Sequence, residues 1–205
     1  SSSRAIPFKK MVEAVQNDPF TPIAWQKEHT GMQGSEYIDE EDSDYLIERW
    51  LRARDNAVNE AKELSKFETT KQLCNRLLEP FMWTTMLITG SKEGWQNFFN
   101  LRCPSYKLIG LDEENVKSRK EWLEKIQFSS ALHPSMYPKT DVEWLQINKG
   151  QAEIHIMDLA EKIYDEYQNS VPLQLKENQW HIPMISDLES LKLSTDDQIK
   201  LSVGR

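Results

Sequence analysis

An arginine at the end of an aromatic helix face is the feature of this sequence that most clearly suggests a chemical role. The face comprises four residues that lie three or four positions apart: Trp95, Phe98, Phe99 and Arg102. A single helix would place all of them on one broad side. A guanidinium at the end of such a side is either a surface arginine anchored by its neighbours or a ligand for an anion. The residue types alone favour the anchored surface arginine.

The segments before Arg102 predict how that helix is positioned. Met82 to Thr89 is dense in β-branched and apolar residues, which predicts a buried strand. Gly90 interrupts the apolar pattern, and Ser91 is a suitable N-cap for a helix that begins at Lys92. We therefore expect a strand that leads into a short helix, with Arg102 at the end of the helix.

The composition is that of one globular domain with an acidic balance. The chain has 205 residues, of which 39% are hydrophobic and 28% are charged, and its net charge is −8. This charge argues against nonspecific nucleic-acid binding, although a local anion pocket is compatible with it. Cys74 and Cys103 are too few for a disulfide framework or a zinc site, and they predict reduced thiols in a cytoplasmic protein. No apolar run approaches about 20 residues, so no membrane span is expected.

Helical patterns dominate the rest of the chain, so the predicted fold class is α+β and rich in helix. The expected helices run from Pro7 to a point before Asp18, from Ile47 to Leu64, from Thr69 to Leu78, from Glu113 to Phe128, from just after Gly150 to about Asn169, and onward from Ser194. The apolar side of the first helix is predicted at Met11, Val12 and Val15. The apolar stripe of the fifth is predicted at Ile156, Ala160, Ile163, Tyr164 and Tyr167. Asp197 stands where it can complete a capping box with Ser194.

Two blocks of the sequence resemble the flavin-dependent thymidylate synthase family. The apolar stretch, T-G turn and helix ending in L-R at Arg102 are similar to the block in which that family places the arginine that holds the uracil of dUMP. Residues 150–160, G-Q-A-E-I-H-I-M-D-L-A, resemble the family's helix A-[QD]-x-E-I-[RQ]-x-x-A and follow in the family's order. In the family the two blocks are nearly adjacent, whereas an insertion of about residues 104–148 separates them here.

Both ends of the chain carry shorter matches to the same family. Ser2-Ser3-Arg4 corresponds to the last three positions of the signature R-H-R-x-x-S-x-N-E-x-S-x-R, and a mobile serine-rich terminus is the alternative interpretation. If the match holds, the flavin-binding R-H-R segment lies before residue 1. Residues 201–205, L-S-V-G-R, are similar to the start of an S-V-A-R-C-A-R-V-S segment of phage-type relatives, which suggests a circularly permuted member.

The resemblance implies a role for individual residues. Arg102 would stabilise charge on the pyrimidine, and Glu153 would orient it through a charge-assisted hydrogen bond. Arg4 would hold the nucleotide phosphate. The other implied contacts are to substrate at Ser2, Ser3 and Gln151, and to flavin at Ser91 and Asn97. For Gln151 and Glu153, a favourable interaction with the helix dipole is an alternative role.

As a whole, the resemblance implies a single thymidylate synthase-like domain over residues 1–205. The enzyme would methylate dUMP to dTMP with methylenetetrahydrofolate as carbon donor, FAD as cofactor and NADPH as reductant, without a metal. It would be a cytoplasmic homotetramer, in the host cytoplasm if viral, whose subunits share active sites. Thr85 stands where the family often has a second substrate arginine.

The departure at Thr85 keeps two alternatives open. One is a related modification of a pyrimidine nucleotide, such as hydroxymethylation. The other is a non-catalytic nucleotide-binding or scaffold descendant of the fold. The insertion, which includes His133, could act as a lid over a pocket.

Overall fold

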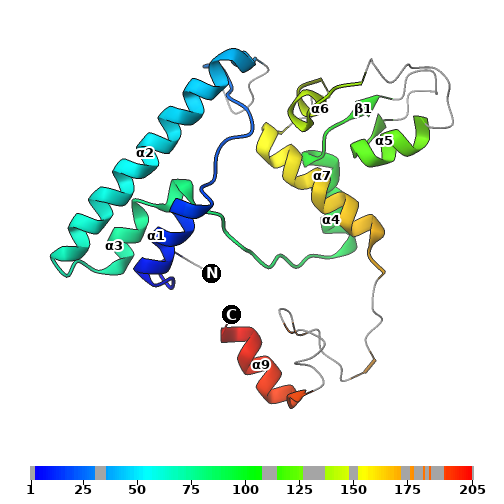
Figure 1. The fold of residues 1–205 in the computed structure, drawn as a ribbon. Coiled ribbons are helices and arrows are strands. Elements are labelled where there is room, and N and C mark those ends of the chain that lie inside the picture. The colour runs from blue at the N-terminus through cyan, green and yellow to red at the C-terminus, as the bar shows by residue number, and fades with distance from the viewer. Residues whose placement is uncertain are drawn as a thin grey trace.

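The chain folds into a helix-rich α+β structure (Figure 1). The computed structural model describes residues 3–30, 36–107, 115–126, 137–147, 152–171, 176–177, 182, 185 and 192–204. In chain order its elements are α1 (Phe8–Asn17), α2 (Glu40–Lys66), α3 (Lys71–Arg76), η1 (Glu79–Phe81), α4 (Lys92–Arg102), β1 (Tyr106–Lys107), β2 (Asn115–Val116), α5 (Arg119–Ile126), α6 (Asp141–Ile147), α7 (Ile154–Asn169) and α9 (Thr195–Gly204). No helix within the described ranges is long and apolar enough to cross a membrane.

Helices α1, α2 and α3 form a first packed unit (Figure 1). Its core contains the buried side chains of Met11, Val12, Val15, Val58, Ala61, Cys74, Leu78 and Phe81, so the predicted apolar side of α1 is confirmed. The Nη1 atom of Arg54 on α2 donates to the carbonyl oxygens of Val15 at 3.1 Å and Gln16 at 3.3 Å. These carbonyls belong to the last turn of α1, so a guanidinium satisfies the negative end of that helix.

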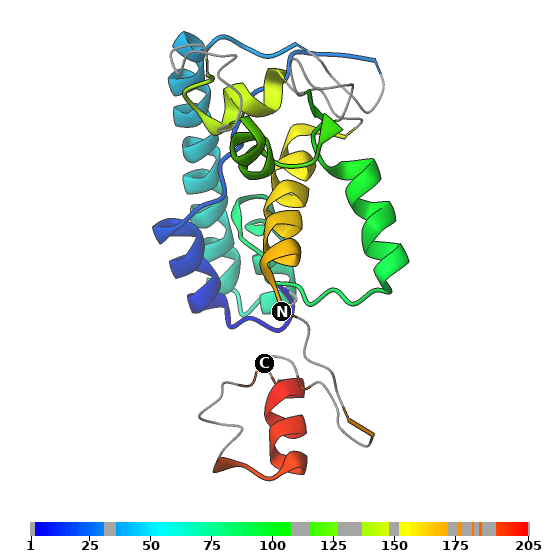
Figure 2. The same cartoon turned by 90° about the vertical axis from the view of Figure 1, so that its right-hand side faces the viewer.

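Helices α4 and α7 form the centre of a second unit and lie side by side (Figure 2). Phe99 of α4 contacts Tyr164 of α7 with ring centroids 5.2 Å apart, and Trp95 contacts Tyr167 at 6.3 Å. Because the earlier residue of α4 faces the later residue of α7, the two helices run antiparallel. Cys103, just after α4, is buried in the same cluster.

The insertion contributes a small core that packs beside α7. Strand β1 pairs antiparallel with β2, with Tyr106 opposite Val116. The indole Nε1 of Trp122 on α5 donates to the carbonyl oxygen of Lys107 at 2.9 Å, which holds the helix against the strand. The buried residues of this core are Tyr106, Val116, Trp122, Ile126 and Trp144.

The helix expected between residues 113 and 128 is shorter than predicted. Val116 belongs to β2, and the helix begins only at Arg119. The hydroxyl of Ser118 accepts a hydrogen bond from the backbone nitrogen of Glu121 at 3.1 Å, which is the contact of an N-cap residue. Asn115 and Val116, which the helical pattern assigned to the helix, therefore pair with β1 instead.

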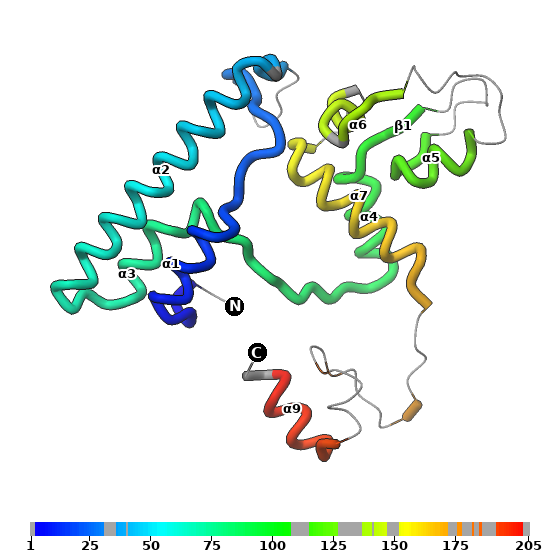
Figure 3. Tube along the Cα trace, viewed as in Figure 1, coloured from blue at the N-terminus to red at the C-terminus, as the bar shows by residue number. Residues whose placement is uncertain are grey.

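The segment predicted as a buried strand is neither a strand nor buried. Residues 83–91 run without regular structure between η1 and α4 (Figure 3). Trp83 is 59% exposed, Met86 69% and Ile88 55%. The paired strands of the described chain are β1 and β2, so this segment has no strand beside it. A strand needs a hydrogen-bonded neighbour, and composition alone does not provide one.

Candidate functional site

Helix α4 is built as the sequence predicts. It covers Lys92–Arg102, and the hydroxyl of Ser91 accepts a hydrogen bond from the backbone nitrogen of Gly94 at 3.1 Å. The pKa of Glu93 in the first turn is lowered, chiefly by a backbone hydrogen bond and then by the Ser91 side chain. Ser91 thus serves as the N-cap, which leaves its hydroxyl partly committed to the fold.

The aromatic face that precedes Arg102 forms the contact between helices. Trp95, Phe98 and Phe99 belong to the cluster that α4 shares with α7. Arg102 itself is exposed at the last residue of α4. Its guanidinium makes no hydrogen bond or ion pair with any residue that the structure describes. The fold therefore uses the three aromatic rings for packing and leaves the cation open to a ligand.

The expected pairing of Glu153 with Arg102 is wrong within one chain. Glu153 is the N-cap of α7, and its carboxylate accepts from the backbone nitrogen of His155 at 3.0 Å and contacts His155 Nδ1 at 2.5 Å. Cys103 lies against Ala160, seven residues further along α7, or about 10 Å at 1.5 Å per residue. Glu153 therefore orients a histidine and caps a helix.

His155 connects the two units of the chain. Its Nε2 atom accepts a hydrogen bond from the backbone nitrogen of Ile23 at 3.1 Å. Nε2 therefore carries no hydrogen, and Nδ1 is the atom that donates to Glu153. The ring also lies 5.9 Å from that of Phe20. The Glu153–His155 pair thus holds the segment that follows α1 against the start of α7.

The N-terminal residues lie on the first unit. The Ser3 carbonyl oxygen accepts a hydrogen bond from Nδ2 of Asn75 at 2.7 Å, and the Ser3 hydroxyl donates to the carboxylate of Glu79. The side chain of Arg4 is exposed. The neighbours of Arg4 are therefore bonded to α3, whereas Arg102 is the last residue of α4, and Figure 1 shows these two helices in different units. One chain does not bring these two arginines together.

The remaining predicted site residues divide into those that the structure describes and those that it does not. Ser2, Gln151 and His133 lie outside the described residues. Asn97 is exposed on α4, but five residues separate it from Arg102, which places it about 140° around the helix. The flavin contacts expected at Ser91 and Asn97 therefore do not form a pocket by themselves. They fit at most one edge of a cofactor that other residues must also hold.

A buried acidic residue, Glu161, lies where no site was predicted. The Tyr106 hydroxyl donates to both of its carboxylate oxygens at 3.0 Å, and the backbone nitrogen of Arg119 donates to one of them at 2.5 Å. Burial raises the pKa of Glu161, and these hydrogen bonds oppose the rise. The sequence did carry a signal, because Glu161 follows Ile154 and Met157 at helical spacing among buried positions.

Two ionisable groups of the cluster between α4 and α7, Cys103 and Tyr164, have raised pKa values. Burial raises the pKa of the Cys103 thiol to about 12, and burial together with Glu121 raises the pKa of Tyr164 to about 12. A neighbouring hollow of about 310 Å³ is lined by charges of both signs, including Arg119 and Lys162. Within the described ranges, no group of three or more His, Cys, Asp or Glu side chains could hold a metal ion.

Of the predicted cationic site residues, Arg4 and Arg102 both have exposed side chains. Arg102 is exposed at the last residue of α4, the helix whose aromatic residues pack against α7. Comparisons of the chain with protein-family models, with curated proteins and with solved structures found no match.

Proposed function

We propose that this chain is a flavin-dependent thymidylate synthase-like enzyme that methylates dUMP to dTMP. Its finer fold would be that of the family, with the insertion of about residues 104–148. The observation that carries the proposal is the uncommitted guanidinium of Arg102, at the end of a helix that begins at the predicted cap and ends at the predicted residue. The sequence resemblance supplies the identity of the ligand.

Arg102 would act by stabilising charge. Uracil is a poor carbon nucleophile until electron density moves onto the carbon that is methylated, and negative charge then develops on a ring carbonyl. A guanidinium fixed at that carbonyl lowers the barrier by electrostatic preorganisation. Methylenetetrahydrofolate would supply the carbon, and FAD, when bound and reduced by NADPH, would supply the electrons. Arg4 would bind the phosphate, because a guanidinium fits two phosphate oxygens at once.

The proposed site requires more than one chain. Arg4 and Arg102 lie on different units, so a nucleotide that contacts both would lie between subunits of the expected homotetramer. The exposed apolar segment 82–90 supports such self-association, because large exposed apolar patches mark interaction sites. Residues 80–91 contain no charged residue, so two copies of this acidic chain could meet there without like-charge repulsion.

Substitution of Arg102 tests the proposal. Removing one such donor typically costs about 100- to 1000-fold in rate, so Arg102→Ala should lose dUMP turnover to that extent while keeping its helical circular dichroism. Arg102→Lys should also be impaired, because lysine lacks the planar fork. Arg52→Ala, which changes an exposed arginine of α2, is the matched control. Full activity of Arg102→Lys would assign the arginine a structural role and remove the basis of the proposal.

Thr85 favours a second candidate function. The side chain of Thr85 is exposed and uncharged. No cation therefore stands at the position where the family often has its second substrate arginine. The chain could then modify a pyrimidine nucleotide differently, for example by hydroxymethylation, or bind one without catalysis. The absorbance spectrum of the purified complete protein separates enzyme from non-catalytic descendant, since bound FAD colours it yellow. Product analysis by mass spectrometry separates the two modifications.

A further inference from the structure

We infer that Lys71, Asn75 and Glu79 act as a brace that fixes the backbone on both sides of Arg4 and so positions its guanidinium for an anionic ligand. The three residues are spaced four apart along α3 and η1, so their side chains can reach the same neighbouring segment. That segment is the N-terminal stretch that carries Arg4. The inference rests on the proposed role of Arg4 at the nucleotide phosphate, and it adds positioning residues to that role.

Asn75 is the centre of the brace. Its side chain is fully buried, and Nδ2 donates to the carbonyl oxygens of Ser3 at 2.7 Å and Ile6 at 3.0 Å. Both hydrogens of the amide are thereby used. The chain turns between these two carbonyls, and Arg4 lies within the turn with its side chain exposed. One buried amide thus holds both ends of the turn that presents Arg4.

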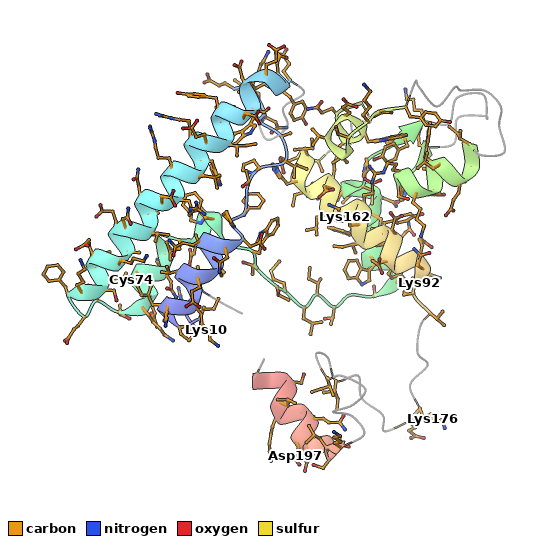
Figure 4. All side chains as sticks on the ribbon, in the orientation of Figure 1. Lys10, Cys74, Lys92, Lys162, Lys176 and Asp197 are labelled. Atoms are coloured by element: carbon orange, nitrogen blue, oxygen red, sulfur yellow. The ribbon has the colours of Figure 1, made fainter. Side chains whose placement is uncertain are left out.

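The outer two residues hold the positions on either side of Arg4. Nζ of Lys71 donates to the carbonyl oxygen of Ala5 at 3.2 Å, and the Ser3 hydroxyl donates to the Glu79 carboxylate. The part of the brace on α3 can be found in Figure 4 from the label of Cys74, which directly precedes Asn75. Hydrogen bonds hold both immediate neighbours of Arg4 in place. The backbone at Arg4 therefore loses less conformational entropy on ligand binding than an unrestrained terminus would lose.

Asn75 makes two hydrogen bonds at the cost of one unpaired atom. The Oδ1 atom of Asn75 is buried and has no hydrogen-bond partner among the described residues. A buried acceptor without a partner costs stability, and the two hydrogen bonds from Nδ2 offset that cost. What Asn75 adds is a pair of donors directed at the backbone around Arg4.

Limited trypsin digestion tests the brace directly, because trypsin cleaves after Arg4 only when the surrounding backbone leaves its turn. Asn75→Asp removes both donors and places a carboxylate against two carbonyl oxygens. Cleavage of the Arg4–Ala5 bond, followed by mass spectrometry, should accelerate by about 10- to 30-fold. Asn56→Asp makes the same chemical change at an exposed position of α2 and should cleave at the wild-type rate. Equal rates in all three proteins would overturn the brace.

A second variant covers the case in which Asn75→Asp does not fold. Lys71→Met removes one exposed donor and leaves the core untouched. Cleavage after Arg4 should then rise by about threefold to fivefold, as expected for one lost hydrogen bond. An unchanged rate in a folded Lys71→Met protein would count against the brace.

A double-mutant cycle on dUMP affinity tests whether Asn75 acts through Arg4. Asn75→Asp should weaken dUMP binding by about tenfold in the wild-type background and leave it unchanged in the Arg4→Ala background, because the positioned group is then absent. In turnover assays KM for dUMP should rise while kcat stays constant. Equal weakening in both backgrounds would refute a positioning role. If the wild-type protein binds no dUMP, the proposed function fails, and the trypsin comparison alone decides on the brace.

Discussion

Replacing Glu161 by glutamine probes how the insertion is attached to α7. Glu161 is 9% exposed and accepts hydrogen bonds from Tyr106 and from the backbone of Arg119, one residue of β1 and one at the start of α5. Glutamine keeps one acceptor oxygen but replaces the other by an amide that cannot accept from Tyr106. The change therefore removes part of the attachment while it conserves side-chain volume.

The size of the effect depends on pH with a defined sign. A buried donor that loses its acceptor costs about 1–3 kcal/mol, which sets the largest loss expected in Glu161→Gln. Burial raises the pKa of Glu161 above 4.5, so the folded state binds the proton more tightly than the unfolded state does. The wild-type protein therefore loses stability as pH rises from 4.5 through the raised pKa. The glutamine variant has no such titration, so the difference between the two proteins should shrink as pH rises.

Urea unfolding followed by tryptophan fluorescence, at several pH values between about 4.5 and 8, measures this difference. Glu166→Gln is the matched control, because Glu166 is exposed on the same helix and its variant should follow the wild-type pH curve. If the gap between wild type and Glu161→Gln stays constant across the range, burial does not govern the titration of Glu161. A variant more stable than wild type at low pH would refute the assigned hydrogen bonds.

Two further outcomes follow from the helix cap and the exposed segment. Ser91→Ala should lower the free energy of unfolding by about 1 kcal/mol, measured by urea denaturation, because Gly94 loses its side-chain acceptor. Ile88→Lys should lower the mass of the protein in light scattering, because a charge would enter the uncharged segment proposed to join subunits; an unchanged assembly would place the interface elsewhere.

Local signals in the sequence predicted the N-terminal caps of two helices, α4 and α9, whereas α2 begins at Glu40, seven residues before the expected Ile47. Ser91 caps α4 as expected, and the Ser194 hydroxyl accepts from the backbone nitrogen of Asp197 at 3.2 Å and donates to its carboxylate at 2.7 Å, which confirms the predicted capping box. These features depend on residues within one turn of each other, so they can be recognised without the rest of the fold.

Features that depend on distant partners could not be predicted in this way. The apolar composition of residues 82–89 indicated a strand, but no neighbouring strand was implied and none lies beside it in the described chain. On α7, Ile156 and Tyr167 were assigned to the apolar stripe, yet they are 41% and 38% exposed, while Ile154 and Met157 are buried. Ile154 and Met157 share a buried cluster with Leu145 of α6, and the stripe pattern alone gave no reason to expect a partner there.

The structure also changes what has to be explained about Arg102. The sequence alone allowed either a structural role or a ligand-binding role for the whole helix face. In the structure the aromatic residues of the face have a structural role, and Arg102 does not take part in their packing. Phe99 packs against α7, and Arg102 remains in solvent. A ligand arginine needs this combination, because its backbone must be rigid while its guanidinium stays open.

The backbone around Arg4 is held on the other unit, since its neighbours Ser3 and Ala5 make hydrogen bonds to α3 and η1. For a ligand of the proposed kind, Arg4 and Arg102 therefore come from different packed units of the chain. Either a second copy supplies one of them, or only one takes part. Mixing an Arg4→Ala protein with an Arg102→Ala protein decides between these cases. Recovery of about a quarter of wild-type activity would require sites built from two chains, because random exchange in pairs leaves that share of sites with both arginines. Activity of the Arg4→Ala protein by itself would leave Arg102 as the sole ligand and return Arg4 to a structural role, and no recovery between two inactive variants in an assembly shown to exchange its subunits would refute the shared site.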